Sequence, residues 1–332
     1  DQYAKDYIKG GWEWAYAELG RINLNDDVYQ RISGKHPAIE FVNDETSVSV
    51  RMHFRPEEPH GHTYTVIFTL YEGKPCLETI WSINGKPADA WPEGGWISFP
   101  LNVSNPQFRL GRPGAVVDPA TDFVKGSNLD YGFVNTGLAV IDANGNGVGL
   151  MSPDVPAVSL DRPGLWKYST GFVPQKSNVF FNLYNNQWST NFTEWIEGSW
   201  SARFYIWGIS NYSNEPSLIT PSEELKNPLM VAHVSAPAGN MPVAAEGIRL
   251  SEKGVLVTYF GQNNTDDGIL LRLWEQSGKS HALRVQFPAE AKFTSALPVN
   301  LRGEKTGNQV KITNNQLLID LKPYSPATYI LK

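Results

Sequence analysis

The chain has 332 residues, of which 41% are hydrophobic and 19% are charged, as is typical of a globular protein and not of a disordered one. Its net charge is −6 and it has no run of lysines and arginines, which argues against a nucleic-acid partner. The single cysteine, Cys76, excludes an internal disulfide and a thiolate metal cluster, and no apolar run reaches the ~20 residues that would span a membrane.

Residues 1–24 are predicted to form a short helical connector. Trp12, Tyr16 and Leu19 fall on one face of a helix over residues 1–20, and Gly20 supplies a stop at its end. From Asp44 onward the period of the apolar residues changes to two. Strands are expected in 46–55, 63–72, 76–85, 94–103, 137–152, 178–185 and 201–209. Many strands with almost no helix predict an all-β fold with a large antiparallel sandwich, rather than a parallel α/β sheet.

The composition changes over residues 211–248, which are rich in proline and show little periodicity, as expected of a linker or a wrapping segment. Strands return at shorter spacing in 254–262, 268–276, 281–288, 309–321 and 327–332. This spacing suits a small immunoglobulin-like β-sandwich. We therefore predict a large β-domain over 25–240 and a small one over 241–332.

Two short motifs raise the question of a metal. "DANGNG" at 142–147 matches the start of a calcium loop, but Pro153 occupies the twelfth position, where such a loop needs a carboxylate. Asn-Gly is also typical of a tight hairpin turn, and we favour the turn. His60 and His62 stand two residues apart, so in a strand both rings would point to one side and could hold a metal. No third ligand is recognisable, and a polar hairpin tip is the alternative.

A cluster of tryptophan and asparagine residues is the strongest candidate for ligand binding. Trp188 and Trp195 stand among Asn185, Asn186 and Asn191 in "NLYNNQWSTNFTEW". An indole face can stack on a sugar ring while amides bond to its hydroxyls, although tryptophans can equally fix a structural loop.

The long irregular stretch 109–128, with Arg112 and Asp118, is a second candidate, because loops of this length inside a domain are often functional. We add Arg112, Asp118, His60 and His62 to the predicted carbohydrate site. No nucleophile elbow, H-E-x-x-H motif or phosphate loop occurs, so no catalytic residue is predicted.

Three segments carry a family resemblance: "ELKNPL", "GVLVTYFGQNNTDDGILLRLWEQSGKSHALRVQFP" and "LKPYSPATYILK". They resemble the C-terminal β-region of glycoside hydrolase family 38, the α-mannosidases, over roughly residues 223–332. The resemblance implies a galactose-mutarotase-like supersandwich over 25–240, a small β-sandwich after it, and a catalytic barrel upstream. In that family the barrel binds zinc through an H-x-D motif. No H-x-D occurs in this chain, so zinc is expected only in an upstream domain and no cofactor is expected here.

The sequence therefore predicts the non-catalytic β-portion of a family-38-like glycoside hydrolase, which shapes or supports a carbohydrate site. Its expected partners are a glycan and an upstream catalytic domain, and its expected location is extracytosolic. A stand-alone carbohydrate-binding protein is the first alternative. A sugar epimerase or lyase that uses His60, His62 or a glutamate as acid or base is the second. "NVFFNLYN" is similar to the run that carries the histidine of mutarotases, but Val179 stands in the place of that histidine.

Overall fold

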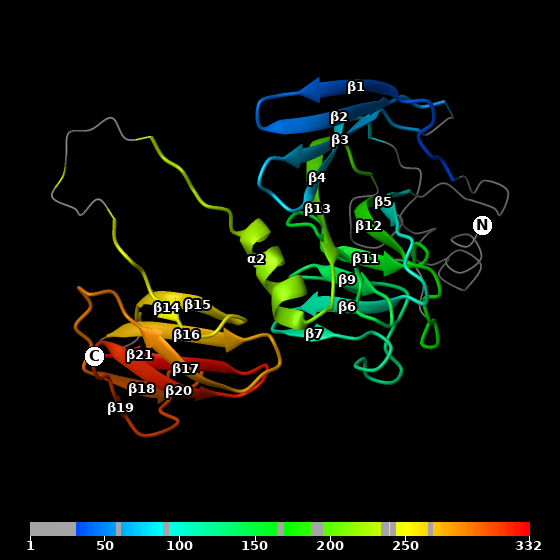
Figure 1. Ribbon diagram of the computed structural model, residues 1–332. Helices are drawn as coiled ribbons and strands as arrows, with labels where there is room; N and C mark the ends of the chain where they lie inside the picture. Colours follow the sequence, from blue (N-terminus) through cyan, green and yellow to red (C-terminus); the bar gives the residue numbers. More distant parts are fainter. Residues whose placement is uncertain are drawn as a thin grey trace. The chain divides into compact units, whose positions relative to one another are not determined.

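The computed structural model describes residues 31–57, 61–88, 93–164, 169–186, 195–233, 239, 244–264 and 268–332. They form two compact units (Figure 1). The first contains the described residues up to Leu110 together with Val117–Tyr212, and the second contains Gly111–Val116 together with Ser213–Lys332. The predicted helix of residues 1–24 lies outside the described residues. The predicted domain limits at 24 and 240 stay predictions.

The first unit is built from two antiparallel sheets. The larger has nine strands in the order β1-β2-β3-β4-β13-β10-β9-β6-β7, and the smaller has four in the order β5-β12-β11-β8. The nine strands are Ala38–Asn43 (β1), Ser47–Phe54 (β2), Tyr64–Tyr71 (β3), Leu77–Lys86 (β4), Gly198–Ile209 (β13), Gly147–Met151 (β10), Leu138–Ile141 (β9), Gln107–Arg112 (β6) and Ala115–Val117 (β7). The four are Gly94–Pro100 (β5), Asn178–Asn185 (β12), Ala157–Leu160 (β11) and Gly132–Phe133 (β8).

The core of the first unit lies between these sheets. Phe99 of β5 and Phe181 of β12 meet Phe204 of β13, with ring centroids 5.2 to 5.9 Å apart. All three side chains are buried, and alternate residues of the same strands point inward beside them. Contacts of this kind between facing sheets define a β-sandwich.

One part of the larger sheet continues the core face without being buried. The register places Phe204 in a row with Thr79, Phe68, Val50 and finally Phe41 on β1. Residues opposite one another share a face of the sheet, so Phe41 lies on the same side as the core, yet 77% of it is exposed. Three further side chains in neighbouring rows of the same face are more than half exposed, namely Ile39, Val48 and Leu70.

The reverse face of the same three strands is polar. Glu40 on β1 forms an ion pair with Arg51 on β2 at 3.0 Å, and the hydroxyl groups of Ser49 and Thr69 lie 3.0 Å apart. The strands thus have a polar side whose groups bond to each other and an apolar side that the described residues leave largely exposed. We call the second the β1–β3 apolar face, made of Ile39, Phe41, Val48 and Leu70 with the half-buried Val50, Met52 and Phe68. Figure 1 shows β1 and β2 at the end of the sheet away from β6 and β7.

The second unit is a smaller sandwich of two antiparallel sheets. One has the order β14-β17-β20 and the other the order β15-β16-β21-β18-β19. Their strands are Arg249–Leu250 (β14), Val255–Gln262 (β15), Ile269–Glu275 (β16), His281–Gln286 (β17), Ser295–Val299 (β18), Val310–Lys311 (β19), Gln316–Leu321 (β20) and Pro326–Leu331 (β21). Leu271, Leu273, Leu283, Val285 and Leu317 are fully buried between them. The predicted fold class, all-β with a large antiparallel sandwich followed by a small one, is confirmed.

The predicted linker 211–248 contains regular structure at its start. A π-helical turn, η3 (Glu215–Ile219), runs directly into α2 (Thr220–Lys226), with Pro221 in the first turn of α2. Leu218 and Ile219 are fully buried, and the segment is assigned to the second unit. None of the helices in the described part of the chain is long and apolar enough to cross a membrane.

A buried carboxylate holds together the segments that carry the family resemblance. Glu275, at the end of β16, is fully buried and accepts hydrogen bonds from the backbone N–H groups of Ser277 (2.8 Å), Gly278 (2.9 Å) and Tyr324 (2.8 Å). The hydroxyl of Ser277 donates to it as well, and Nε2 of His281 lies 3.3 Å away. One hydrogen-bond network therefore joins the motifs "LWEQSG" and "PYS", which are 49 residues apart at Glu275 and Tyr324.

Candidate functional site

The candidate site lies where four strands of the first unit begin or end. His62 precedes β3, and Lys86 is the last residue of β4, the strand paired with β3. Glu93 precedes β5, and Asn186 follows β12, the strand paired with β5. Because β3 is antiparallel to β4 and β5 to β12, each pair of positions falls at one end of its sheet. We call these four residues the Glu93 cluster.

Glu93 is the centre of the cluster. Its Oε2 lies 2.8 Å from Nε2 of His62, and its Oε1 lies 2.5 Å from Nζ of Lys86. Its backbone N–H donates to Oδ1 of Asn186 at 2.7 Å, and its carbonyl accepts from the N–H of Asn186 at 3.0 Å. A carboxylate can only accept, so the contact with His62 places that imidazole's proton on Nε2.

Lys86 is the most unusual member because its side chain is fully buried. Burying an ammonium group is costly unless it is paired and hydrogen-bonded. Besides Glu93, Nζ donates to the carbonyl of Ile196 at 2.7 Å, and it lies 5.5 Å from the centroid of the Tyr184 ring. Lys86 thus joins Glu93 to the chain segment that begins at Trp195.

Aromatic side chains form the wall beside the cluster. The Tyr184 ring meets Trp200 edge-on at 5.5 Å, and its centroid lies 6.3 Å from that of His62 and 6.4 Å from that of Trp81. Burial, together with the negative charge of Glu93, raises the pKa of the Tyr184 hydroxyl far above its usual value. Tyr184 is therefore a neutral hydrogen-bonding group at physiological pH and not a base.

The structure brings several predicted residues together. His62 and Asn186 belong to the Glu93 cluster, and Asn185 is the last residue of β12, next to Asn186. Trp195 precedes Ile196, the residue that Lys86 holds, and 45% of it is exposed. Trp188, Asn191 and His60 lie outside the described residues.

Asp118 lies far from these residues. It follows β7, whereas the Glu93 cluster is at β3 and β4, and β13, β10, β9 and β6 come between β4 and β7 in the sheet. Adjacent strands are ~4.8 Å apart, so about 20 Å or more separates the two places. Asp118 accepts from Nη1 of Arg109 at 2.7 Å and from the N–H of Ala120 at 2.9 Å, which makes it part of a turn. Arg112 ends β6, in the segment Gly111–Val116 that belongs to the second unit.

The two motifs considered for metal have ordinary structural roles where they are described. Oδ1 of Asp142 accepts from the N–H groups of Asn144 (2.8 Å) and Asn146 (2.9 Å), so "DANGNG" is the hairpin turn between β9 and β10. In the described ranges, no three His, Cys, Asp or Glu side chains are grouped closely enough to hold a metal ion.

Sequence reasoning missed Lys86 and Glu93. Strict alternation from the buried Trp81 and Ile83 would put Lys86 on the solvent side of β4. A bulge in β4, where Asn84 and Gly85 stand opposite the single residue Ser199 of β13, breaks the alternation and turns Lys86 inward. Glu93 stands directly before Gly94 and Gly95, and nothing in that pattern indicates a buried ion pair.

Comparison with known proteins supports the resemblance. The model of the glycosyl hydrolases family 38 C-terminal β-sandwich domain matches residues 254–329. A protein in glycosyl hydrolase family 38 from Enterococcus faecalis is 11% identical, with a TM-score of 0.65 over 90% of this chain and 37% of its own. An α-mannosidase from E. faecalis V583 is 10% identical, with a TM-score of 0.65 over 90% of this chain and 35% of its own. No curated protein matches the chain by sequence.

The predicted resemblance to the C-terminal β-region of family 38 is therefore confirmed, and in fold it extends over most of the chain. The chain spans about a third of the length of the solved structures that it matches.

Proposed function

We propose that this chain is the non-catalytic β-portion of a family-38-like, α-mannosidase-like glycoside hydrolase, and that it supports a carbohydrate site. The observation that carries the proposal is the agreement of fold over 90% of the chain with proteins of which it covers only 37% and 35%. The catalytic barrel, with its zinc, would be the upstream part. The metal site is assigned to that part because the H-x-D motif of the family does not occur in this sequence.

The β1–β3 apolar face supports the same proposal. Its residues continue the core face of the sheet, and Phe41 is 77% exposed. A contiguous apolar patch beside a polar reverse face is the pattern of an interaction surface. In this proposal the occupant is the upstream portion of the same protein, because β1 is the first described strand of the chain.

The Phe41→Asp variant tests this contact. We expect it to abolish or weaken at least tenfold the co-purification of this chain with a separately expressed upstream region, because a carboxylate would be buried at the interface. Val42→Asp is the matched control, since Val42 is the next residue of β1 and its side chain points to the reverse face. Equal binding by both variants, or an upstream region without an H-x-D barrel, would contradict the proposal.

The Glu93 cluster favours a second candidate, a stand-alone carbohydrate-binding protein. Trp195 has an exposed side chain and directly precedes Ile196, whose carbonyl accepts a hydrogen bond from the buried Lys86. Asn186 belongs to the same cluster. An aromatic face beside fixed polar groups is suited to a sugar ring and its hydroxyls.

The Trp195→Ala variant tests the second candidate. Loss of stacking should weaken mannoside binding by the isolated chain about tenfold or more, measured by calorimetry, with the unfolding temperature unchanged. Trp207→Phe is the control, because Trp207 is buried in β13. Unchanged binding in Trp195→Ala would rule this candidate out. Sugar turnover by the isolated chain that disappears in His62→Ala would instead favour the epimerase or lyase, with the His62–Glu93 pair as acid and base.

A further inference from the structure

Two adjoining shallow pockets lie at the five-stranded sheet of the second unit, and the first of them is on its outer face. One, of about 260 Å³, is lined by Tyr259, Gln262, Asn264, Arg272 and Arg302 among others. The other, of about 380 Å³, lies beside it, and Asn300 and Leu301 line both. Small-molecule sites usually measure ~300–1,000 Å³, so the first pocket lies just below this range and the second near its lower end, and neither suits a group larger than one sugar residue.

Tyr259 is fixed as a flat platform at the first pocket. A bulge between Val257 and Tyr259 in β15 sets Tyr259 opposite Arg272 of β16. The Tyr259 hydroxyl donates to the carbonyl of Gln262 at 3.0 Å, so the ring lies along its own strand toward the C-terminal end, over Gly261. A Cβ at position 261 would be 3.2 Å from that hydroxyl, so the glycine makes room for the ring. The ring is 39% exposed and is held in place before any ligand arrives.

Arg272 supplies a positive charge that the described residues do not neutralise. It stands between Tyr259 on β15 and Thr328 on β21, and its Nε is buried without a hydrogen-bond partner in the described structure. Neither Arg272 nor Arg302 pairs with a carboxylate in the described ranges, whereas Arg109 and Arg203 both do. A buried, unpaired guanidinium N–H is costly, and a planar carboxylate is its best-matched partner.

The loop that carries Arg302 is also formed in advance. Oδ1 of Asn300 accepts from the N–H groups of Arg302 (2.9 Å) and Glu304 (3.0 Å). Nδ2 of Asn300 donates to the Glu304 carboxylate at 2.7 Å, which keeps that acid bound to the asparagine. Arg302 is thus presented at the rim by a rigid turn, and a ligand would not have to order it.

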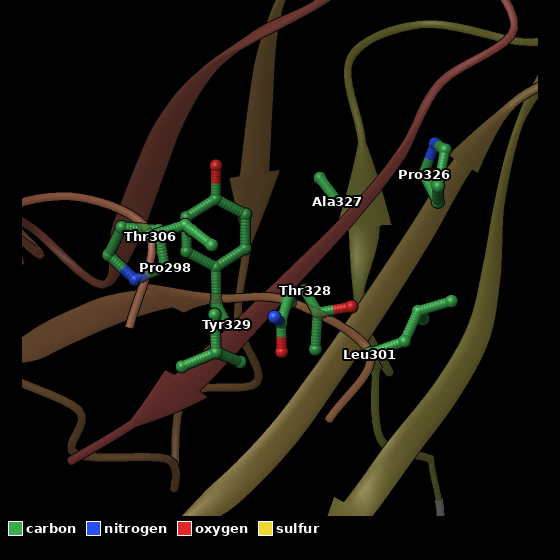
Figure 2. A pocket seen from close by; sticks show the side chains of 9 residues that line it. Pro298, Leu301, Thr306, Pro326, Ala327, Thr328 and Tyr329 are labelled. Atoms are coloured by element: carbon green, nitrogen blue, oxygen red, sulfur yellow. The ribbon is translucent and has the colours of Figure 1, made fainter. Parts of the chain in front are cut away.

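The second pocket adjoins the first and has no charged residue in its lining. Figure 2 shows the Tyr329 ring beside Pro298 and Thr306, with Thr328 and Leu301 on its other side. This lining provides apolar contacts and hydroxyl groups but no charge. A neighbouring neutral residue of a glycan would fit here, next to a charged residue in the first pocket.

We propose that this face is a binding site for an acidic sugar, with the sugar's carboxylate on Arg272 and Arg302 and its ring on Tyr259. Amide groups of Gln262 and Asn264 at the rim are suited to hydroxyl groups. A single carboxylate is favoured over a polyanion because the whole chain carries a net charge of −6, which repels an extended negative ligand. The site lies within the second unit and does not depend on the proposed function of the chain.

The test compares two ligands that differ in one group, methyl β-glucuronide and methyl β-glucoside, titrated into the full chain and followed by NMR. We expect the glucuronide to bind about tenfold more tightly, as one charge-assisted pair would give. Arg272→Gln should remove this preference, and Tyr259→Ala should weaken both ligands about tenfold. Arg284→Gln, an exposed position on β17 in the other sheet, is the control and should change neither affinity.

Arg302→Gln adds a variant that the fold will tolerate, because Arg302 is exposed on a loop whose hydrogen bonds use its backbone. It should reduce the preference for the glucuronide severalfold. Equal affinity for the two glycosides, a preference that survives both arginine variants, or no binding of either ligand at tens of millimolar would each overturn the proposal.

Discussion

Replacing Glu275 with alanine is expected to lower the free energy of unfolding of the second unit by about 3–5 kcal/mol. The substitution leaves the N–H groups of Ser277, Gly278 and Tyr324 without the acceptor they now share. Each unsatisfied buried donor costs about 1–3 kcal/mol, and a domain has only about 5–15 kcal/mol in total. Hydrogen exchange of β16 and β20, or denaturant unfolding, would measure the loss.

The contribution of Glu275 should depend on pH in a defined direction. Burial alone would raise the pKa of this carboxyl, but the hydrogen bonds from Ser277, Tyr324 and Gly278 outweigh it and lower the pKa below its ordinary value. A carboxyl whose pKa is lower in the folded state stabilises the fold fully above its unfolded pKa. This stabilisation is lost as the pH falls through the folded value. The difference in stability between wild type and Glu275→Ala should therefore shrink only in acid, below about pH 4.

Glu252→Ala is the matched control for Glu275. Glu252 also approaches His281, at 3.8 Å, but its side chain is 46% exposed. An exposed pair of this kind is worth about 0–1 kcal/mol. A similar loss in the two variants, or a Glu275→Ala effect that is unchanged down to pH 3, would show that the buried network does not hold the second unit together.

The sequence predicted the strands whose apolar residues alternate regularly and missed those defined by their surroundings. The predicted strand 178–185 matches β12 in full, and 201–209 lies within β13. β1 was missed, and all six of its residues are exposed. The helical segment Glu215–Lys226 was taken for a linker because of its prolines, yet Pro221 stands in the first turn of a helix, where proline is tolerated.

The candidate site was only half predictable, because its parts come from distant segments. The tryptophan and asparagine pattern pointed to Asn186 and Trp195, which the structure places at or beside the Glu93 cluster. The ion pair at the centre of the cluster joins Lys86, at the end of β4, to Glu93, which precedes β5. No local sequence pattern indicates such a pair. Asp118 was grouped with the tryptophans by chemistry alone, and the strand order separates them.

Lys86→Met is expected to destabilise the first unit by about 3 kcal/mol or more. It removes the charge that faces Glu93, whose side chain is only 15% exposed, and so leaves that carboxylate largely buried and uncompensated. It also removes the donor to the carbonyl of Ile196, so the segment at Trp195 should be cut faster by a protease at native pH. Denaturant unfolding would give the first effect and limited proteolysis the second.

A double variant, Lys86→Met with Glu93→Leu, separates the cost of an unpaired charge from the value of the pair. Replacing a buried ion pair by apolar groups is often close to neutral, so the double variant should recover most of the stability lost in Lys86→Met. It should not restore resistance to proteolysis at Trp195, because methionine cannot donate a hydrogen bond to the carbonyl of Ile196. Arg203→Ala, which breaks an exposed pair with Asp154, is the control and should cost about 1 kcal/mol or less. If Lys86→Met costs no more than Arg203→Ala, the Glu93 cluster does not anchor this end of the sandwich.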